Sequence, residues 1–189
     1  MEQLILASAS PRRAQLLKQI GIPFKVVKNR YEEPEITAEN TLEAVALAKA
    51  KSVSAEYPHN LILAADTVVV CENRVLGKPK DEKEAQMMLR LLSGRVHRVA
   101  TAVALIKGER EAVSREETFV WMREIEEEEI KAYTASTEPY DKAVYAIQGK
   151  GAVFVEKVQG CFFNVVGLPL FRVVLMLKKW NISVWQGDD

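Results

Sequence analysis

Residues 61–65 are apolar at every position, and a second apolar run at 68–70 follows after Asp66 and Thr67. Strands buried on both faces have near-continuous apolar sequences of this kind, whereas strands with one solvated face alternate. The stretch therefore predicts a central strand of a sheet. A chain with such a strand must supply other elements to cover the sheet.

The rest of the chain contains both helical and extended patterns. Strands are expected at 4–7, 24–27, 96–106 and 112–122, and a further hairpin at 152–158 and 161–166. Helices are expected at 11–20, 40–56, 81–93, 126–135 and from Pro169. This order, with its long hairpins, predicts an α/β fold with a mixed sheet. The length of 189 residues suits one domain, or one domain with two lobes.

Charge and cysteine content exclude several classes of protein. The chain has 26 basic and 26 acidic residues, which disfavours nucleic acid and anionic membranes as partners. No apolar run approaches the roughly 20 residues of a membrane helix. Two cysteines without a CxxC pattern are expected as reduced thiols. With no signal-peptide pattern, the expected location is the cytoplasm.

The turn after the first strand carries an unusual pair of cations. Ser10 is a suitable N-cap and Pro11 suits the first helical position, yet Arg12 and Arg13 follow in the first turn. A helix N-terminus is already positive, so cations there are unfavourable unless an anion is shared. One interpretation is a capped helix with two solvated arginines. The other is an anion site, in which Ser8 and the free backbone N–H groups also take part.

Asp66 is expected at or near the end of the central strand. An unpaired carboxylate is costly to bury, so Asp66 must meet water, a cation or a metal. The alternatives are a structural salt bridge or turn cap, and a metal ligand or general base at a strand end.

Other polar residues are individually weaker candidates. Glu33 lies in an acidic loop with Glu32 and Glu35, where solvation is the usual state. Lys51 follows alanines at helical spacing, which directs it along a closely packed seam, and Lys78 stands in a Gly-Lys-Pro turn. Both are also compatible with ordinary surface positions.

Gln148 stands among glycines in a polar, aromatic segment. Its amide can offer both a donor and an acceptor to the edge of a nucleic base, or can bond to the loop backbone. His59 and His97 lack partners in any motif, and there is no HExxH, zinc or Ser-His-Asp pattern. Triad hydrolysis and zinc catalysis are therefore not expected.

Taken together, these segments resemble the Maf-like nucleoside triphosphate pyrophosphatases, and in particular the branch that acts on dTTP and UTP. The matching stretches are "LILASASPRR", "EE" at Glu32–Glu33, "AKAKS", "LAADTVV", "LGKP", "MLRLLSG", "EPYDKAVYAIQGKGAVFV" and "VVGLPL". One departure is visible: "DKAVYAIQG" stands where the family pattern is nearer "DKAGAYGIQG", so it is one residue shorter and lacks two glycines.

The resemblance implies a single Maf-like domain over residues 1–189, with the inosine-triphosphatase-like fold: an elongated mixed sheet, flanking helices and a cleft between two lobes. It also implies hydrolysis of a nucleotide to the monophosphate and pyrophosphate with a divalent cation, Mg²⁺ or Mn²⁺, and a homodimer. Asp66 matches the proton acceptor, and Arg13, Thr67 and Gln148 match positions linked to substrate choice. The 7-methyl-GTP branch has an acidic residue where Gln148 stands.

The chemistry of the residues agrees with this reading. A nucleoside triphosphate carries about four negative charges near neutral pH. The candidate phosphate ligands are Ser8, Arg12, Arg13, Lys51 and Lys78. Glu33 and Asp66 are the candidate metal ligands. Attack at the α-phosphorus is expected, and Gln148 is expected to pair with N3–H and O4 of uracil or thymine.

A different class of function is also open. The protein can bind nucleotides without significant turnover and regulate cell division or septum formation through a partner, as the family's name for septum inhibition suggests. A third reading, nucleic-acid binding by the arginine cluster, is disfavoured by the balanced charge.

Overall fold

The computed structural model describes residues 3–32, 41–136 and 144–185, and its centre is a seven-stranded mixed sheet. The strands in spatial order are β2 (Phe24–Val27), β1 (Leu4–Ala7), β3 (Ile62–Cys71), β5 (Val96–Lys107), β6 (Arg110–Met122) and β7 (Val155–Gln159). A short strand, β4 (Arg74–Leu76), pairs with β3 beside this path. β1 runs parallel to β2 and β3, and the other pairs are antiparallel. The predicted mixed α/β fold is confirmed.

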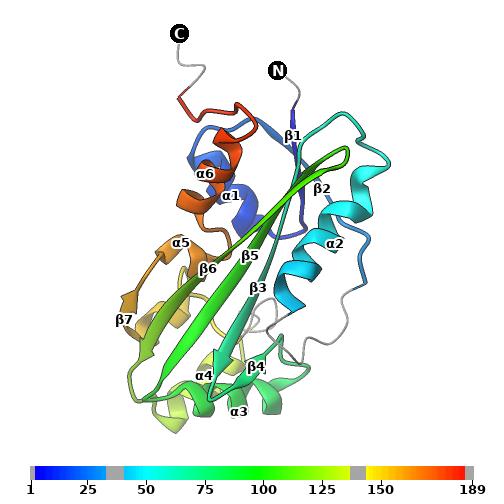
Figure 1. Ribbon diagram of the computed structural model, residues 1–189. Helices are drawn as coiled ribbons and strands as arrows, with labels where there is room; N and C mark the ends of the chain where they lie inside the picture. The colour runs from blue at the N-terminus through cyan, green and yellow to red at the C-terminus, as the bar shows by residue number, and fades with distance from the viewer. Residues whose placement is uncertain (1–2, 33–40, 137–143, 186–189) are drawn as a thin grey trace.

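Helices cover both faces of the sheet around β1 and β3 (Figure 1). α1 (Pro11–Gln19) and α6 (Leu170–Lys178) pack on one face, where Leu63 and Ala65 belong to their core. α2 (Leu42–Ser54) packs on the other face against Ile62 and Ala64. Because side chains alternate along a strand, β3 must be apolar at successive positions, which explains its sequence. None of the helices in the described part of the chain has the length and apolar character needed to cross a membrane.

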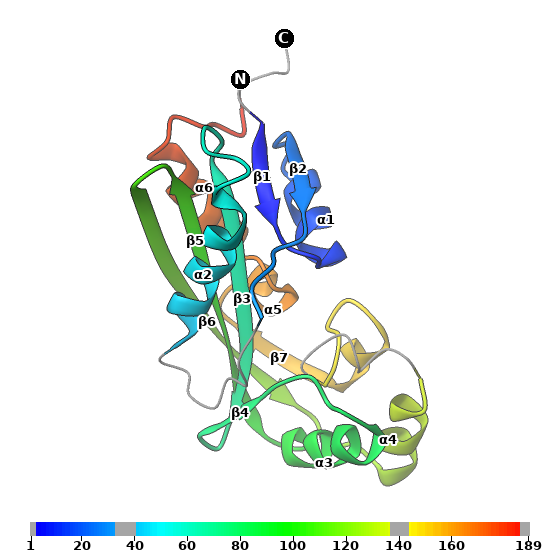
Figure 2. The same cartoon turned by 90° about the vertical axis from the view of Figure 1, so that its right-hand side faces the viewer.

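A further set of elements packs at the other end of the long strands (Figure 2). It contains α3 (Glu82–Leu92), α4 (Glu127–Thr134) and the 3₁₀ helix η3 (Lys150–Phe154). Their core includes Leu89, Ile130 and Phe154, packed against Val99 and Val120 of the long strands. α3 begins as predicted, since the Asp81 side chain accepts a hydrogen bond of 2.8 Å from the Glu84 N–H. Strands β3, β5 and β6 therefore link two lobes. The first lobe has a core on each face of the sheet, and the second has a single core.

The second predicted hairpin is wrong. Residues 155–159 do form a strand, β7, which pairs with β6, but the second half of the hairpin is the short helix α5 (Phe162–Val166). Asn164 explains the difference: its buried amide donates hydrogen bonds of 2.9 Å to the Val99 carbonyl and to Thr118 Oγ1. These tertiary bonds outweigh the strand preference of the local sequence.

Candidate functional site

The turn between β1 and α1 forms one side of the candidate site. Ser8 is buried directly after β1, and its Oγ accepts a hydrogen bond of 3.1 Å from the Ser10 N–H. Ser10 occupies the N-cap position of α1, but its side chain makes no capping bond within the part of the chain described. Arg12 and Arg13, both half-buried, follow in the first turn. The helix thus begins beside two guanidinium groups, as the sequence predicts.

Arg13 is fixed by three hydrogen bonds, two of them to segments distant in the sequence. Its Nε donates to the Gly167 carbonyl at 2.9 Å, and its two terminal nitrogens donate to Thr67 Oγ1 at 3.1 Å and to Ser8 Oγ at 3.4 Å. Gly167 ends α5 with a φ of +120°, a conformation that L side chains rarely adopt. Arg13 is therefore held in one orientation and does not extend into solvent.

The hydroxyl that holds Arg13 is itself oriented by a buried chain of hydrogen bonds. Thr67 Oγ1 lies 2.9 Å from Thr101 Oγ1, which donates to the Asn164 carbonyl at 3.1 Å. Because the Thr101 proton is used on Asn164, the Thr67 hydroxyl donates to Thr101 and accepts from Arg13. The chain joins α1, β3, β5 and α5 at one point.

Asp66 lies in the middle of β3, not at its end as predicted, and it is paired with a residue that the sequence reading missed. Its Oδ1 accepts a charge-assisted hydrogen bond from Lys49 Nζ of α2, and both side chains are buried. A buried charge is costly to desolvate, and the attraction between two opposite buried charges offsets part of that cost. Among the described residues, Lys49 is therefore the partner that allows the Asp66 carboxylate to be buried.

Lys51, the predicted phosphate ligand, is placed elsewhere. It is exposed, and its Nζ pairs with Glu111 Oε1 at 2.6 Å. Glu111 is opposite Ile106 in the β5–β6 ladder, whereas Asp66 is opposite Ala102 on β5. Four residues of strand span about 13 Å. Residues two positions apart on a helix point about 200° apart around its axis. Lys49 therefore faces the sheet when Lys51 faces solvent.

The apolar stripe of α2 contains the signal that identifies Lys49. Lys49 follows the buried Val45 by four residues and precedes the buried Val53 by four, so it lies on the same helix face. A lysine on a buried stripe needs a carboxylate partner, and Asp66 is the unexplained carboxylate on the neighbouring strand. The pairing of Arg13 with Gly167, by contrast, spans 154 residues and has no local signal.

Asp66 and Thr67 leave opposite faces of the sheet. Asp66 is in phase with Ala64 and Val68, which pack in the core beneath α2, and Thr67 is in phase with Ala65, in the core beneath α1 and α6. The Lys49–Asp66 pair and the Arg13–Thr67 contact are therefore on two sides of one strand.

One edge of β3 has no strand partner over a short interval that includes Asp66 and Thr67, as far as the described part of the chain shows. The β1 pairing ends at Leu63 and the β4 pairing begins at Val69, so residues 64–68 lack a neighbour on that edge. Ser8 follows the end of β1, at the start of this interval. A ligand at the carboxyl end of β1 can thus be approached by groups from both faces of the sheet, in the position where α/β sheets bind ligands.

Lys78 and Gln148 are exposed and are not hydrogen-bonded to Asp66 or Arg13 in the described part of the chain. Lys78 follows β4, which pairs with β3 beyond the unpaired interval. Gln148 follows Ile147, which contacts the core beneath α1 and α6 as well as the core of the second lobe. Lys78 is therefore on a segment next to β3, and Gln148 is on a segment at the junction of the lobes. Glu33 lies outside the described residues.

The carboxylate of Asp66 suits a divalent cation. Its Oδ2 is buried and has no hydrogen-bond partner among the described residues, so one hard oxygen atom is available as a ligand. No cluster of three or more acidic, histidine or cysteine ligands occurs within the described ranges. Mg²⁺ is commonly held by one or two carboxylates together with phosphate oxygens and water, which agrees with this sparse donor set.

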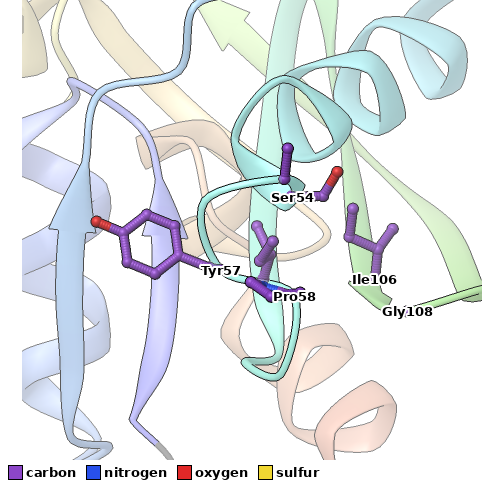
Figure 3. Close-up of a pocket in the computed structure, with 7 residues that line it drawn as sticks. Ser54, Tyr57, Pro58, Ile106 and Gly108 are labelled. Atoms are coloured by element: carbon purple, nitrogen blue, oxygen red, sulfur yellow. The ribbon is translucent and has the colours of Figure 1, made fainter.

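A small pocket of about 170 Å³ has none of these groups in its lining. Figure 3 shows the residues that line it. It is lined by residues at the end of α2 and the facing strands: Ser54, Ala55, Tyr57, Pro58, Ile62, Ile106 and Gly108. Its lining contains no charged side chain. A pocket of this character does not match a polyanion, so the candidate site remains at the β1–α1 turn.

Comparisons with known proteins agree with these observations. A family model described as Maf-like protein matches residues 3–180. A dTTP/UTP pyrophosphatase of Symbiobacterium thermophilum is 47% identical over 191 residues, covering 99% of this chain and 98% of the relative. A protein of the same name from Bacillus cereus is 46% identical over 188 residues, covering 97% and 98%. Protein VC0702 from Vibrio cholerae gives a structural match with a TM-score of 0.41, at 11% identity over 61% of each chain, which is too low to inform the fold.

Proposed function

Because this chain belongs to the Maf-like protein family, we propose that it hydrolyses dTTP and UTP to the nucleoside monophosphate and pyrophosphate. The observation that carries the proposal is the arrangement at the carboxyl end of β1. There Arg13 is fixed by Thr67 and Gly167, while the buried Asp66 keeps one carboxylate oxygen without a described partner. The near-full-length similarity to two proteins named for this activity supports the choice of substrates.

The cations around the unpaired edge of β3 bind the triphosphate. Arg12 and Arg13 at the start of α1 supply planar donors, the Ser8 hydroxyl and the α1 N-terminus add neutral donors, and Lys78 lies on the segment after β4. Lys51 pairs with Glu111 instead, and the buried Lys49 acts on Asp66. Since Arg13 is held by three contacts before any anion arrives, little side-chain entropy is lost on binding.

Asp66 accepts the proton of the attacking water. Lys49 donates to Oδ1, so Oδ2, which has no partner among the described residues, is the oxygen that accepts the proton. The water oxygen bonds to the α-phosphorus while the bond from that phosphorus to the bridging oxygen breaks. The bonding electron pair leaves with pyrophosphate, and the water proton passes to Asp66.

We further propose that Asp66 and Glu33 hold a divalent cation, Mg²⁺ or Mn²⁺. When bound, such an ion offsets phosphate charge and stabilises the departing pyrophosphate. Gln148 recognises the base: its carbonyl accepts from N3–H and its amide donates to O4 of uracil or thymine. Because this edge is the same in the two bases, one glutamine serves both dTTP and UTP.

A nucleotide panel tests the function. Purified protein with Mg²⁺ or Mn²⁺ is expected to release pyrophosphate from dTTP and UTP faster than from ATP or GTP. Release of inorganic phosphate with a diphosphate product contradicts the proposed cleavage site. Tight nucleotide binding without hydrolysis across several metals contradicts the enzyme and favours the cell-division regulator. The homodimer stays a prediction.

A further inference from the structure

His97 is a buried titratable residue that the proposed mechanism does not use. It lies on β5 with 2% of its surface exposed, and its Nε2 is 2.7 Å from the hydroxyl of Tyr145, which is 6% exposed. The two rings meet edge to face, with centroids 5.4 Å apart at 84°. Burial lowers the pKa of His97 to about 4, so the imidazole is neutral at pH 7 and the contact is a hydrogen bond between neutral groups.

A second buried tyrosine fixes the next residue of the same segment. The Tyr133 hydroxyl of α4 accepts a hydrogen bond of 3.2 Å from the Ala146 N–H. A Cβ atom on Gly151 would lie 3.0 Å from that hydroxyl and from the Ala146 backbone, so the chain approaches too closely there for any other residue without a shift. The Gly149 N–H closes the turn on the Ala146 carbonyl at 3.0 Å. Residues 145–149 are therefore tied to β5, α4 and η3.

The start of this segment has an unfavourable backbone conformation. Val144 has a φ of +74° and is fully buried. This left-handed region is rarely adopted by β-branched residues. Such a conformation persists only when the surrounding structure determines it. The two tyrosine contacts, which begin at the next residue, supply that restraint.

We propose that His97 is a positioning residue which, through Tyr145, holds the segment that presents Gln148 to the base of the nucleotide. This inference rests on the proposed function, because it requires that Gln148 reads uracil or thymine. The phosphates are held by Arg13 in one lobe and the base by a segment anchored in the other, so the span between them must be fixed. A displacement of about 1 Å is enough to weaken recognition.

Tyr145→Phe is the sharpest test, since it removes one hydroxyl and keeps the ring. KM for UTP is expected to rise about tenfold with kcat within about twofold, because the His97 nitrogen loses its buried partner. His97→Leu is expected to behave alike, and His97→Gln, which keeps a polar atom near the position of Nε2, to recover most of the loss. Tyr57→Phe removes a hydroxyl away from the candidate site and is the matched control.

Ribose 5-triphosphate, which has the phosphates and no base, separates positioning from general stability. Its hydrolysis is expected to be unchanged by Tyr145→Phe, and the effect of Tyr145→Phe on UTP is expected to vanish in a Gln148→Ala background. Equal losses for UTP and ribose 5-triphosphate, or no loss for either, overturn the positioning role. A wild-type enzyme with no preference for UTP over ribose 5-triphosphate overturns base recognition itself and, with it, the role of His97.

Discussion

Two lysines on α2 have opposite surroundings although they are two positions apart. Lys49 is buried against Asp66, and Lys51 is exposed and paired with Glu111. The buried pair is coupled to the proposed chemistry, because the carboxylate that Lys49 contacts is the proposed proton acceptor. The exposed pair is screened by solvent and contributes little.

Substitution of each lysine by methionine separates the two environments. Lys49→Met is expected to destabilise the fold by about 3–5 kcal/mol, since it leaves the Asp66 charge buried and unpaired. It is also expected to reduce pyrophosphate release from UTP severely, whereas Lys51→Met changes stability by less than about 1 kcal/mol and leaves turnover unaltered. Urea unfolding and initial rates measure both. A loss of turnover in Lys51→Met alone would return the phosphate-binding role to Lys51.

Asp66→Asn tests the proton acceptor while keeping the size of the side chain. Turnover of dTTP and UTP is expected to fall by at least about a hundredfold, with nucleotide binding retained. Equilibrium binding of UTP, measured beside the rate, distinguishes loss of chemistry from loss of the site. Unchanged turnover removes Asp66 from the proposed mechanism.

Individual site residues were predictable from the sequence where their charge is unfavourable in the local structure. A carboxylate within an apolar strand and two cations at a helix start are such violations, and Asp66 and Arg13 lie beside the unpaired edge of β3. The alanine spacing that directs attention to Lys51 does not show that Lys49 shares the buried stripe of Val45 and Val53. Gly167 has no comparable signal, since its importance comes from a contact with a residue 154 positions away.

At the scale of elements, the short helix α5 and its terminal glycine determine where Arg13 points. The Gly167 carbonyl, which accepts from Arg13 Nε, follows a helix whose buried Asn164 is bonded to both β5 and β6. α1, β2, α3 and the long hairpin followed from periodicity and capping residues. α5 did not, because a five-residue apolar segment carries too few turns to show helical periodicity.

Gly167→Ala is expected to weaken substrate binding through this helix end. A Cβ would be 3.6 Å from Thr67 Oγ1 and 3.8 Å from Arg13 Nε, so it fits, but the φ of +120° is strained by about 1–3 kcal/mol. The carbonyl moves to relieve the strain, and KM for UTP rises about tenfold. Gly108→Ala in the β5–β6 turn, at φ +58° with open space around it, is strained as well but lies away from the candidate site. An equal change of KM in both variants would contradict the role of the Gly167 carbonyl.

At the scale of the whole molecule, the fold class was predictable and the placement of the site was not. The apolar strand and the long hairpins predict a mixed sheet with helices. The sheet is mixed because β1 runs parallel to β2 and β3, whereas β3, β5 and β6 pair antiparallel. The positions of Asp66 and Thr67 on opposite faces, and the unpaired edge beside them, depend on where β1 and β4 stop pairing. Strand register of this kind is set by tertiary packing and is not written in any single segment.

Burial of His97 makes the stability of the whole fold depend on pH. Its pKa is about 4 in the folded chain and 6.5 when exposed, so between these values the unfolded chain binds a proton that the folded chain does not. Stability is expected to decrease as the pH falls through this window, by roughly 2 kcal/mol from His97 alone between about pH 7 and pH 5. Urea unfolding of the wild type and of His97→Gln at both pH values isolates this contribution. A pH dependence that is the same in the two proteins contradicts it.

Strands β3, β5 and β6 run without interruption from one lobe to the other, over 10, 12 and 13 residues. Hinge closure of two domains takes place at a few flexible linker residues. Here the lobes are connected by a ladder of backbone hydrogen bonds about 35–40 Å long. Rotation of one lobe against the other would have to break or bend that ladder. The spacing between the two halves of the site is therefore set when this ladder forms during folding.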